Sequence, residues 1–365
     1  MRTLHMIQGV STLALGFCVA VTAVADACTG ITLTAEDGSV IHARTGEFGT
    51  PLDVRILIMP SGITQTGGQV TASKPASWTA KYGFVGVNAH GAPAALDGIN
   101  EAGLAAGAFY FPDYADYATV SSADDGTVVS PLLFVNWVLT NFATIEEVRA
   151  ALPGIKVSGA PLADWGGIVA PFHWIVQDPS GESIVIEPVD GQLKVYDDPL
   201  GVITNAPTFD WHLTNLRNFI YLSPLNVPPV TLDGLELKQL GQGSGLAGLP
   251  GDFTPPSRFV RAVVFSQTAF PSATGPEAVE EAFHILNQFD IPRGAVVGVD
   301  DGKPQADITQ ATVAADTRAR KFYMHTFKSR QIQMIDLSKI DFETIGVVQI
   351  DPPSTERIED VTPVN

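Results

Sequence analysis

Residues 25–44 read ADACTGITLTAEDGSVIHAR, and this stretch decides how the chain begins to fold. From Cys28 to Leu33, small or polar residues alternate with apolar ones, which is typical of a half-buried strand. Asp37-Gly38 is a turn pair that favours a tight hairpin, and Ser39–Arg44 has the composition of a returning strand. The sequence therefore predicts a β-hairpin whose first strand begins at Cys28 and whose second strand ends at Arg44.

The 27 residues before this hairpin have the pattern of a secretory signal peptide. A weakly basic start precedes a mostly apolar run, which ends in the small-x-small cleavage site Ala25-Asp26-Ala27. Cleavage there would make Cys28 the first residue of a single domain spanning residues 28–365. Cys18, the other cysteine, lies within the signal, so the mature chain would carry one thiol and no internal disulfide. We expect an exported protein, either periplasmic or secreted.

A cysteine at a cleavage site has three interpretations. As an N-terminal nucleophile, Cys28 combines a thiol with a free α-amine, whose reference pKa of about 8 suits a base near neutral pH. As a lipoprotein cysteine it would be acylated, but Ala25 stands where a larger aliphatic residue is usual, and Asp26 is a poor neighbour. It could also be an inert thiol. The position favours the N-terminal nucleophile. A papain-like cysteine–histidine pair remains possible in principle, but it would not need Cys28 at a cleavage site.

Composition narrows the class of protein. The 338 residues that remain (365 − 27) suffice for a large core, and 45% of the chain is hydrophobic, as in globular proteins. The net charge of −18 argues against nucleic-acid partners, and no later stretch approaches the ~20 apolar residues of a membrane span. The histidines form no metal-binding pattern. Gly241-x-Gly243-x-Gly245 lacks the Lys-Ser/Thr ending of a phosphate loop, so we expect no cofactor.

Strand signals dominate, and helical segments stand between them. A three-stranded antiparallel meander is predicted over His173–Gln177, Ser183–Glu187 and Leu193–Tyr196, with turns at Pro179-Ser180-Gly181 and Asp190-Gly191. Helices are predicted over residues 131–142, 144–152 and 276–289, the second opening with the capping box Thr144-Ile145-Glu146-Glu147. Blocks of strands separated by helices predict an α+β fold with helices packed on antiparallel sheets.

Seven sequence blocks extend this reading: Cys28–Ile31, Ala43–Phe48, Asp97–Leu104, Phe109–Pro112, Phe172–Ile175, Ile203–His212 and Leu240–Arg261. In this order they resemble the choloylglycine hydrolase family, which contains bile salt hydrolases and penicillin V acylases. The resemblance covers Cys28 to about Ile350. It implies the four-layer αββα N-terminal nucleophile hydrolase fold, in which two antiparallel sheets lie between two helix layers, commonly as a homotetramer.

The resemblance also implies roles for individual residues around Cys28. Arg44, already expected near the thiol from the hairpin, would be the cation that lowers the pKa of that thiol. Asn205 would donate to the oxyanion, helped by the backbone N–H of Tyr110. Arg258 would be the second active-site arginine. Glu47 stands where the family usually has an aspartate that orients the N-terminal amine, a departure that lengthens the side chain by one methylene.

These inferences predict an exported cysteine amidohydrolase that cleaves linear amide C–N bonds in small molecules. Tyr110 and Glu47 favour a penicillin V-like acyl amide, with conjugated bile salts or acyl-homoserine lactones as alternatives. Two other outcomes stay open. Acylation of Cys28 would give a lipid-anchored binding protein, and the change at Glu47 could leave an inactive scaffold. Substrate choice would depend on loops near residues 49–53, 109–117 and 153–165.

Overall fold

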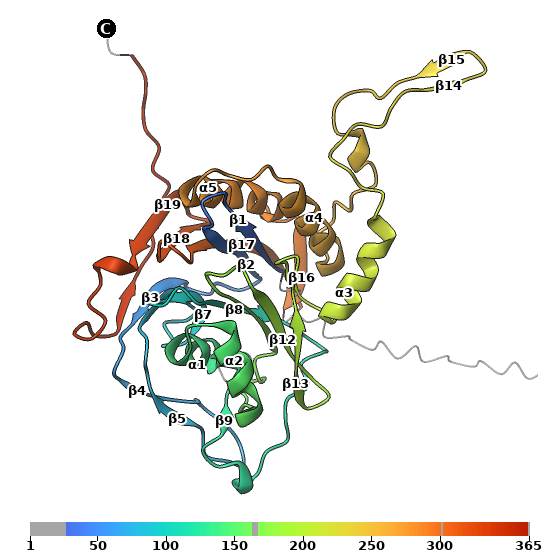
Figure 1. Ribbon diagram of the computed structural model, residues 1–365. Helices are drawn as coiled ribbons and strands as arrows, with labels where there is room; N and C mark the ends of the chain where they lie inside the picture. The colour runs from blue at the N-terminus through green and yellow to red at the C-terminus, as the bar shows by residue number, and fades with distance from the viewer. Residues whose placement is uncertain (1–26, 163–166, 301, 364–365) are drawn as a thin grey trace, which may run out of the picture.

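The computed structural model describes residues 27–162, 167–300 and 302–363. Two large antiparallel sheets pack face to face, and helices cover their outer sides (Figure 1). The predicted signal peptide lies outside the described residues except for Ala27. The predicted α+β class is confirmed.

The first sheet contains the N-terminal hairpin. Its strands follow the order β1 (Cys28–Thr34), β2 (Val40–Phe48), β17 (Lys303–Asp316), β18 (Lys321–Thr326) and β19 (Ser329–Asp336), with β16 (Val296–Asp300) also paired to β17. The predicted hairpin is confirmed, but its second strand does not end at Arg44. It continues because β17 pairs with it as far as Phe48. Cys28 therefore lies opposite Gly46, and Arg44 lies opposite Gly30.

The second sheet contains the predicted meander. Its eight strands follow the order β13 (Gln192–Asp197), β12 (Ser183–Val189), β11 (Phe172–Gln177), β8 (Ala105–Tyr110), β7 (Ala95–Asn100), β6 (Phe84–Asn88), β3 (Arg55–Met59) and β20 (Val348–Ile350). The meander β11-β12-β13 is confirmed. Smaller pairs are β4 (Thr64–Thr66) with β5 (Ser77–Thr79), and β9 (Val128–Val129) with β10 (Lys156–Val157).

Five α-helices are described: α1 (Phe134–Asn141), α2 (Ile145–Ala151), α3 (Phe209–Leu216), α4 (Pro255–Thr268) and α5 (Gly275–Leu286). α1, α2 and α5 confirm the three predicted helices, and the Thr144 hydroxyl caps α2 by accepting from the Glu147 N–H (3.2 Å). α3 and α4 were not predicted. α4 opens with Pro255-Pro256, which resembles a helix breaker but fits the first helical turn, where no intrahelical N–H bond is lost.

Apolar side chains fill the spaces between these layers. Between the sheets, Ile56, Val85 and Ile99 pack with Val313 and Met324. α5 packs on β1, β2 and β17, and α4 packs on β1, whereas α1 packs on β7 and β8 of the other sheet. The order of layers is therefore helix, sheet, sheet, helix, as the resemblance implies. Short 3-10 turns lie at Ser122–Asp124, Pro131–Leu133, Leu152–Gly154, Arg217–Phe219, Ser244–Leu246, Asn287–Phe289 and Leu337–Lys339.

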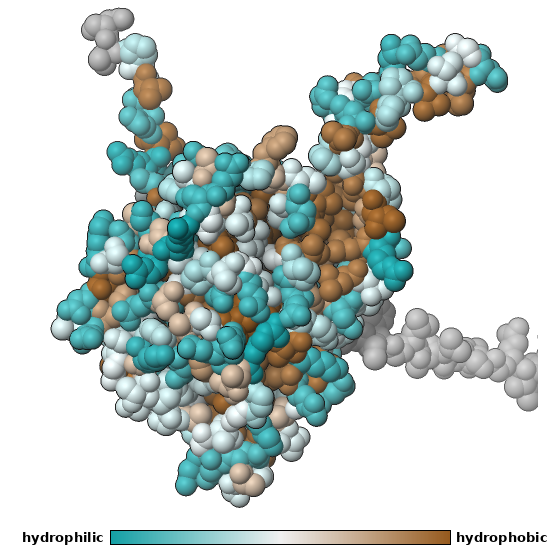
Figure 2. Space-filling view, viewed as in Figure 1, coloured by the Kyte–Doolittle hydropathy of each residue, from teal (hydrophilic) through white to brown (hydrophobic). Residues whose placement is uncertain are grey.

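One segment stands away from the layered body. Residues 220–250, here called the arm, extend outward between α3 and α4 and end in the hairpin β14 (Val230–Leu232) and β15 (Leu235–Leu237) (Figure 1). Its apolar side chains are exposed, which Figure 2 shows as hydrophobic colour along the arm. Leu240 is fully exposed, and Leu225 and Leu235 are more than half exposed.

Candidate active site

Cys28 is buried at the start of β1, and a guanidinium lies against its sulfur. Arg44 Nη2 donates to Cys28 Sγ at 2.9 Å. The rest of this guanidinium donates to the carbonyls of Thr45 (3.1 Å) and Ala108 (2.5 Å), and it lies 4.1 Å above the Phe109 ring centroid. Arg44 is only 6% exposed, so it is a fixed cation inside the protein and not a surface arginine.

Opposing effects act on the thiol. Burial raises the pKa of Cys28, since the thiolate loses hydration, and the nearby Glu47 carboxylate also raises it. Arg44 and Arg258 lower the pKa by stabilising the thiolate. Burial is the largest of these effects, so the pKa of the thiol is raised with Ala27 still attached.

Arg258 fixes the backbone around the nucleophile. It lies in the first turn of α4 and is 1% exposed. Its Nη1 donates to the carbonyl of Cys28 and to Thr29 Oγ1 (2.9 Å), and its Nη2 donates to Asn205 Oδ1 (2.6 Å). Burial lowers the pKa of Arg258 to about 10, which still leaves it cationic near neutral pH. One side chain thus joins α4, β1 and the Asn205 loop.

Asn205 contacts both the nucleophile and Tyr110. Its Oδ1 accepts from the Cys28 backbone nitrogen (2.9 Å), and its Nδ2 donates to the Tyr110 carbonyl (2.7 Å). An amide nitrogen carries two hydrogens, so the Tyr110 carbonyl takes one and the oxyanion role predicted for Asn205 requires the other. The Tyr110 side chain lines the cavity beside Cys28, and its ring meets that of Phe48 edge to face (6.3 Å between centroids).

Glu47 lies beside this cluster in a dry environment. It is 2% exposed, and Thr309 Oγ1 donates to its Oε1 at 2.9 Å. Its Oε2 has no hydrogen-bond partner among the described residues. Burial raises the pKa of Glu47 to about 7, against the lowering effects of Arg258, the hydrogen bonds from Thr45 and Thr309, and Arg44. The Glu47 N–H also donates to the carbonyl of Ala27 (3.2 Å). The structure therefore brings together all six residues predicted for the site.

Two histidines that the sequence analysis considered only as metal ligands hold the Asn205 loop. His173 Nε2 donates to the Thr204 carbonyl (3.2 Å), and His212 Nε2 donates to the Asn205 carbonyl (3.0 Å). Glu187 Oε1 contacts His173 Nδ1 (3.0 Å) and accepts from the Phe209 N–H that opens α3 (3.0 Å). Burial lowers the pKa of His212 to about 4, so it is neutral. The sequence offered one signal: both histidines lie inside blocks that carry the resemblance.

A cavity of about 50 Å³ reaches the sulfur from between the two sheets. Tyr110, Phe48 and Phe172 contribute rings to its wall. Aliphatic side chains line much of the rest: Leu52, Val54, Val87, Leu96, Ala108 and Val313. Of the three loops expected to set specificity, 49–53 and 109–117 contribute Leu52 and Tyr110, whereas the described part of 153–165 contributes nothing to this wall.

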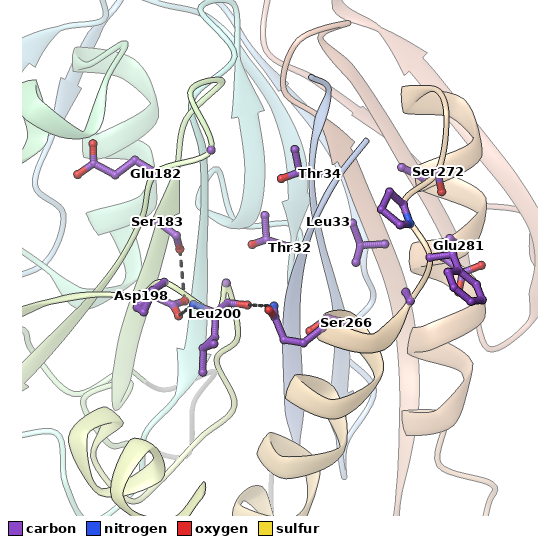
Figure 3. A pocket seen from close by; sticks show the side chains of 18 of the residues that line it. Thr32, Leu33, Thr34, Glu182, Ser183, Asp198, Leu200, Ser266, Ser272 and Glu281 are labelled. Atoms are coloured by element: carbon purple, nitrogen blue, oxygen red, sulfur yellow. Dashed lines mark hydrogen bonds between the residues drawn. The ribbon is translucent and has the colours of Figure 1, made fainter. Parts of the chain in front are cut away.

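A larger groove of about 590 Å³ lies between the meander and helices α4 and α5 (Figure 3). Thr32, Ser183, Asp198 and Glu281 line it, and none of the six predicted site residues does. Ser183 Oγ donates to Asp198 Oδ2 (3.3 Å), and burial raises the pKa of Asp198 to about 7. This polar groove is separate from the cavity at Cys28.

The described residues contain no cluster of three or more histidine, cysteine, aspartate or glutamate side chains able to hold a metal ion. In the same part of the chain, no helix combines the length and apolar character needed to cross a membrane.

Comparison with known proteins agrees with this geometry. The family described as linear amide C–N hydrolases, choloylglycine hydrolase family, matches residues 28–350. A bile salt hydrolase/transferase of Clostridium perfringens is 33% identical over 314 residues, covering 86% of this chain and 93% of that protein. A penicillin V acylase of Pectobacterium atrosepticum is 26% identical, covering 84% and 79%. A crystal structure of conjugated bile acid hydrolase from Clostridium perfringens superposes with a TM-score of 0.81 at 31% identity, covering 92% of this chain and 100% of that one. The predicted N-terminal nucleophile hydrolase fold is confirmed.

Proposed function

The chain belongs to the choloylglycine hydrolase family of linear amide C–N hydrolases, and we propose that Cys28 acts as its nucleophile once the preceding residues have been removed. One observation carries the proposal. Arg44 donates to Cys28 Sγ, while Asn205 and Arg258 hold the backbone of the same residue. A buried thiol with a guanidinium at 2.9 Å is equipped to form a thiolate when a base is available.

The base in this proposal is the α-amine of Cys28 itself. The amine takes the proton of the thiol, and the sulfur attacks the acyl carbonyl carbon, whose oxygen becomes negatively charged. Asn205 Nδ2 and the Tyr110 N–H would donate to that oxygen. When the C–N bond breaks, the ammonium returns its proton to the leaving amine, which leaves a thioester. Water, losing a proton to the same amine, attacks the thioester and releases the carboxylic acid and free thiol.

Glu47 takes the position of the orienting acid in this scheme. Its Oε2 lacks a partner among the described residues, and its backbone N–H binds the carbonyl of Ala27, the residue that would be lost. A carboxylate there would accept a hydrogen from the new amine and keep its lone pair directed at the thiol. The longer Glu side chain is compatible with this role because Thr309 anchors its other oxygen.

The cavity supports an apolar acyl group. A volume of about 50 Å³ is well below the ~300–1,000 Å³ of typical small-molecule sites, so a bound acyl group must displace part of the wall. Phe48 and Val54 form that wall on one side and also line an open cleft of about 770 Å³. The bile salt hydrolases among the relatives favour a steroid-like acyl group. Tyr110 in the wall favours the aryl group of penicillin V as the second candidate.

Export and assembly are part of the same proposal. Removal of a signal peptide would expose the amine of Cys28 and place the enzyme in the periplasm or medium. A homotetramer is supported by the exposed leucines of the arm, since apolar surface on a projecting hairpin is stabilised by burial against another subunit. Light scattering of Leu232→Asp and Leu235→Asp should give smaller species than wild type, with Ile358→Asp, an exposed residue outside the arm, as the matched control.

The test of activity is amine release by the mature protein from penicillin V, glycocholate, taurocholate and a long-chain acyl-homoserine lactone. Cys28→Ala, which removes the sulfur but little volume, should lose more than about 1,000-fold in rate. Retention of the wild-type rate by Cys28→Ala would exclude the mechanism. An intact mass with a diacylglycerol adduct would instead show that the amine is blocked and favour a lipid-anchored protein. If no substrate turns over, a rate gained by Glu47→Asp would identify an inactivated scaffold.

A further inference from the structure

Asn88 is the feature of the catalytic cavity that the proposed chemistry leaves unexplained. It ends β6, is fully buried, and lines the same cavity as Cys28. Apart from the catalytic residues, the side chains around it in this wall are aliphatic or aromatic. Its Oδ1 has no hydrogen-bond partner among the described residues.

The orientation of this amide is fixed by its other end. Asn88 Nδ2 donates to the Ala92 carbonyl at 2.7 Å. A carbonyl oxygen can only accept, so the nitrogen must face Ala92 and the oxygen must be the unpaired atom. The unpaired atom, Asn88 Oδ1, is therefore a hydrogen-bond acceptor, and a matching ligand must supply a donor.

A buried acceptor without a donor is costly, and native proteins rarely leave one unmatched. We propose that Asn88 is a specificity-determining residue whose Oδ1 accepts a hydrogen bond from a hydroxyl group on the acyl part of the substrate. The inference rests on the proposed function, because it assumes that the acyl group occupies the cavity at Cys28. A donor-free acyl group, such as the phenoxyacetyl group of penicillin V, would leave this acceptor unmatched.

The matched test uses glycine conjugates of one steroid acyl skeleton carrying three, two, one or no hydroxyl groups. Wild-type enzyme should prefer the best hydroxylated conjugate over the hydroxyl-free one by about 10- to 100-fold in kcat/KM, since a site built to bind a hydroxyl discriminates against its absence. Asn88→Leu, similar in volume, should bring this ratio of kcat/KM values to within about threefold, because the hydroxylated conjugates lose more than the hydroxyl-free one.

Asn136 provides the matched control. It is equally buried, and its Nδ2 donates to the Pro93 carbonyl (3.0 Å) in the loop that Asn88 also holds, but it does not line the cavity. Asn136→Leu should slow all conjugates by a common factor. If it removes the hydroxyl preference as Asn88→Leu does, the effect comes from the loop and the inference is wrong.

The substrate series separates this inference from the proposed function. Equal rates for hydroxylated and hydroxyl-free conjugates in wild type would overturn the role of Asn88 and leave the amidohydrolase intact. Absence of turnover for every amide would overturn the proposed function. In that case, calorimetry with the Cys28→Ala protein still tests Asn88, by comparing the affinities of the hydroxylated and hydroxyl-free free acids. Tighter binding of the hydroxylated acids that is lost in Cys28→Ala/Asn88→Leu would support the role of Asn88. Equal binding of all the acids would refute it.

Discussion

Thr309→Val should change the pH dependence of catalysis without touching the reacting atoms. Thr309 Oγ1 donates to Glu47 Oε1 at 2.9 Å and accepts from the Ile291 N–H at 3.0 Å. Valine has nearly the same shape but no hydroxyl, so the ionised form of Glu47 loses a donor in a buried site. A hydrogen bond to a charged group contributes about 1.5–3 kcal/mol, which corresponds to a rise of about one to two in the pKa of Glu47.

The proposed mechanism requires the ionised form of Glu47. Only the ionised carboxylate accepts a hydrogen from the Cys28 amine, so protonation of Glu47, together with protonation of the amine itself, should lower kcat/KM as the pH drops. That pKa is about 7 with Ala27 attached, and a freed ammonium would lower it. In Thr309→Val the acidic limb should move up by about one to two pH units. At a pH on that limb the rate should fall about 10- to 100-fold, whereas on the plateau above it the rate should be close to wild type.

The assay is the full pH profile of kcat/KM for wild type, Thr309→Val and Thr309→Ser. Serine keeps the hydroxyl and should keep the wild-type limb. Thermal unfolding should be measured in parallel, because Thr309→Val also leaves the Ile291 N–H without its acceptor. A Thr309→Val profile that drops equally at every pH, with its limb unmoved, would refute the assignment of Glu47 as the titrating acid.

Three further predictions concern stability. Arg258→Leu leaves the Cys28 carbonyl and Asn205 Oδ1 without the hydrogen bonds that Arg258 donates, so it should lower the free energy of unfolding by about 3–5 kcal/mol in urea titrations. A loss of less than about 1 kcal/mol would contradict this role of Arg258. The pKa of Asp198, about 7 when folded, lies about three pH units above its ordinary 3.8, so the folded state keeps a proton that the unfolded chain releases as the pH rises. The free energy of unfolding should therefore fall by up to about 4 kcal/mol between pH 4 and 8, and Asp198→Asn should flatten that decline in the same titrations; parallel curves would contradict it. A Cβ on Gly30 would lie 2.8 Å from both Ile203 and Phe109, so Gly30→Ala should cost about 1–3 kcal/mol, whereas Gly154→Ala, with open space around it, should cost little.

Local sequence patterns predicted part of the fold. The alternation after Cys28 and the Asp37-Gly38 turn predict the hairpin β1-β2, and the meander β11-β12-β13 follows from the same kind of pattern. The end of β2 could not be predicted, because its last residues are held by β17, more than 250 positions away. α4 was missed because it begins with two consecutive prolines, and such a pair fits a loop as well as the first turn of a helix.

The candidate site likewise combines residues that local sequence could bring together with residues that it could not. Cys28 and Arg44 could be paired from the hairpin alone, since both belong to it. Asn205 and Arg258 were placed near them only through the resemblance, because nothing local in their own segments indicates a contact with β1. The sequence analysis did not recognise four residues as parts of the site: Glu187, His173, Thr309 and Asn88. Their contacts with the site come from the packing of distant segments, which local sequence does not specify.

By itself, the sequence determined the strand that begins at the nucleophile, the cation on its partner strand and the family to which the chain belongs. Tertiary structure decided which groups meet around that nucleophile. Thr309 and Glu47 are 262 positions apart and bond only because β17 lies beside β2. Asn88, whose Oδ1 lacks a hydrogen-bond partner among the described residues, shares a cavity with Cys28 only because the two sheets pack face to face. Alternation and turn chemistry are local and can be read along the chain, whereas hydrogen-bond partners and burial depend on how distant strands pair and stack.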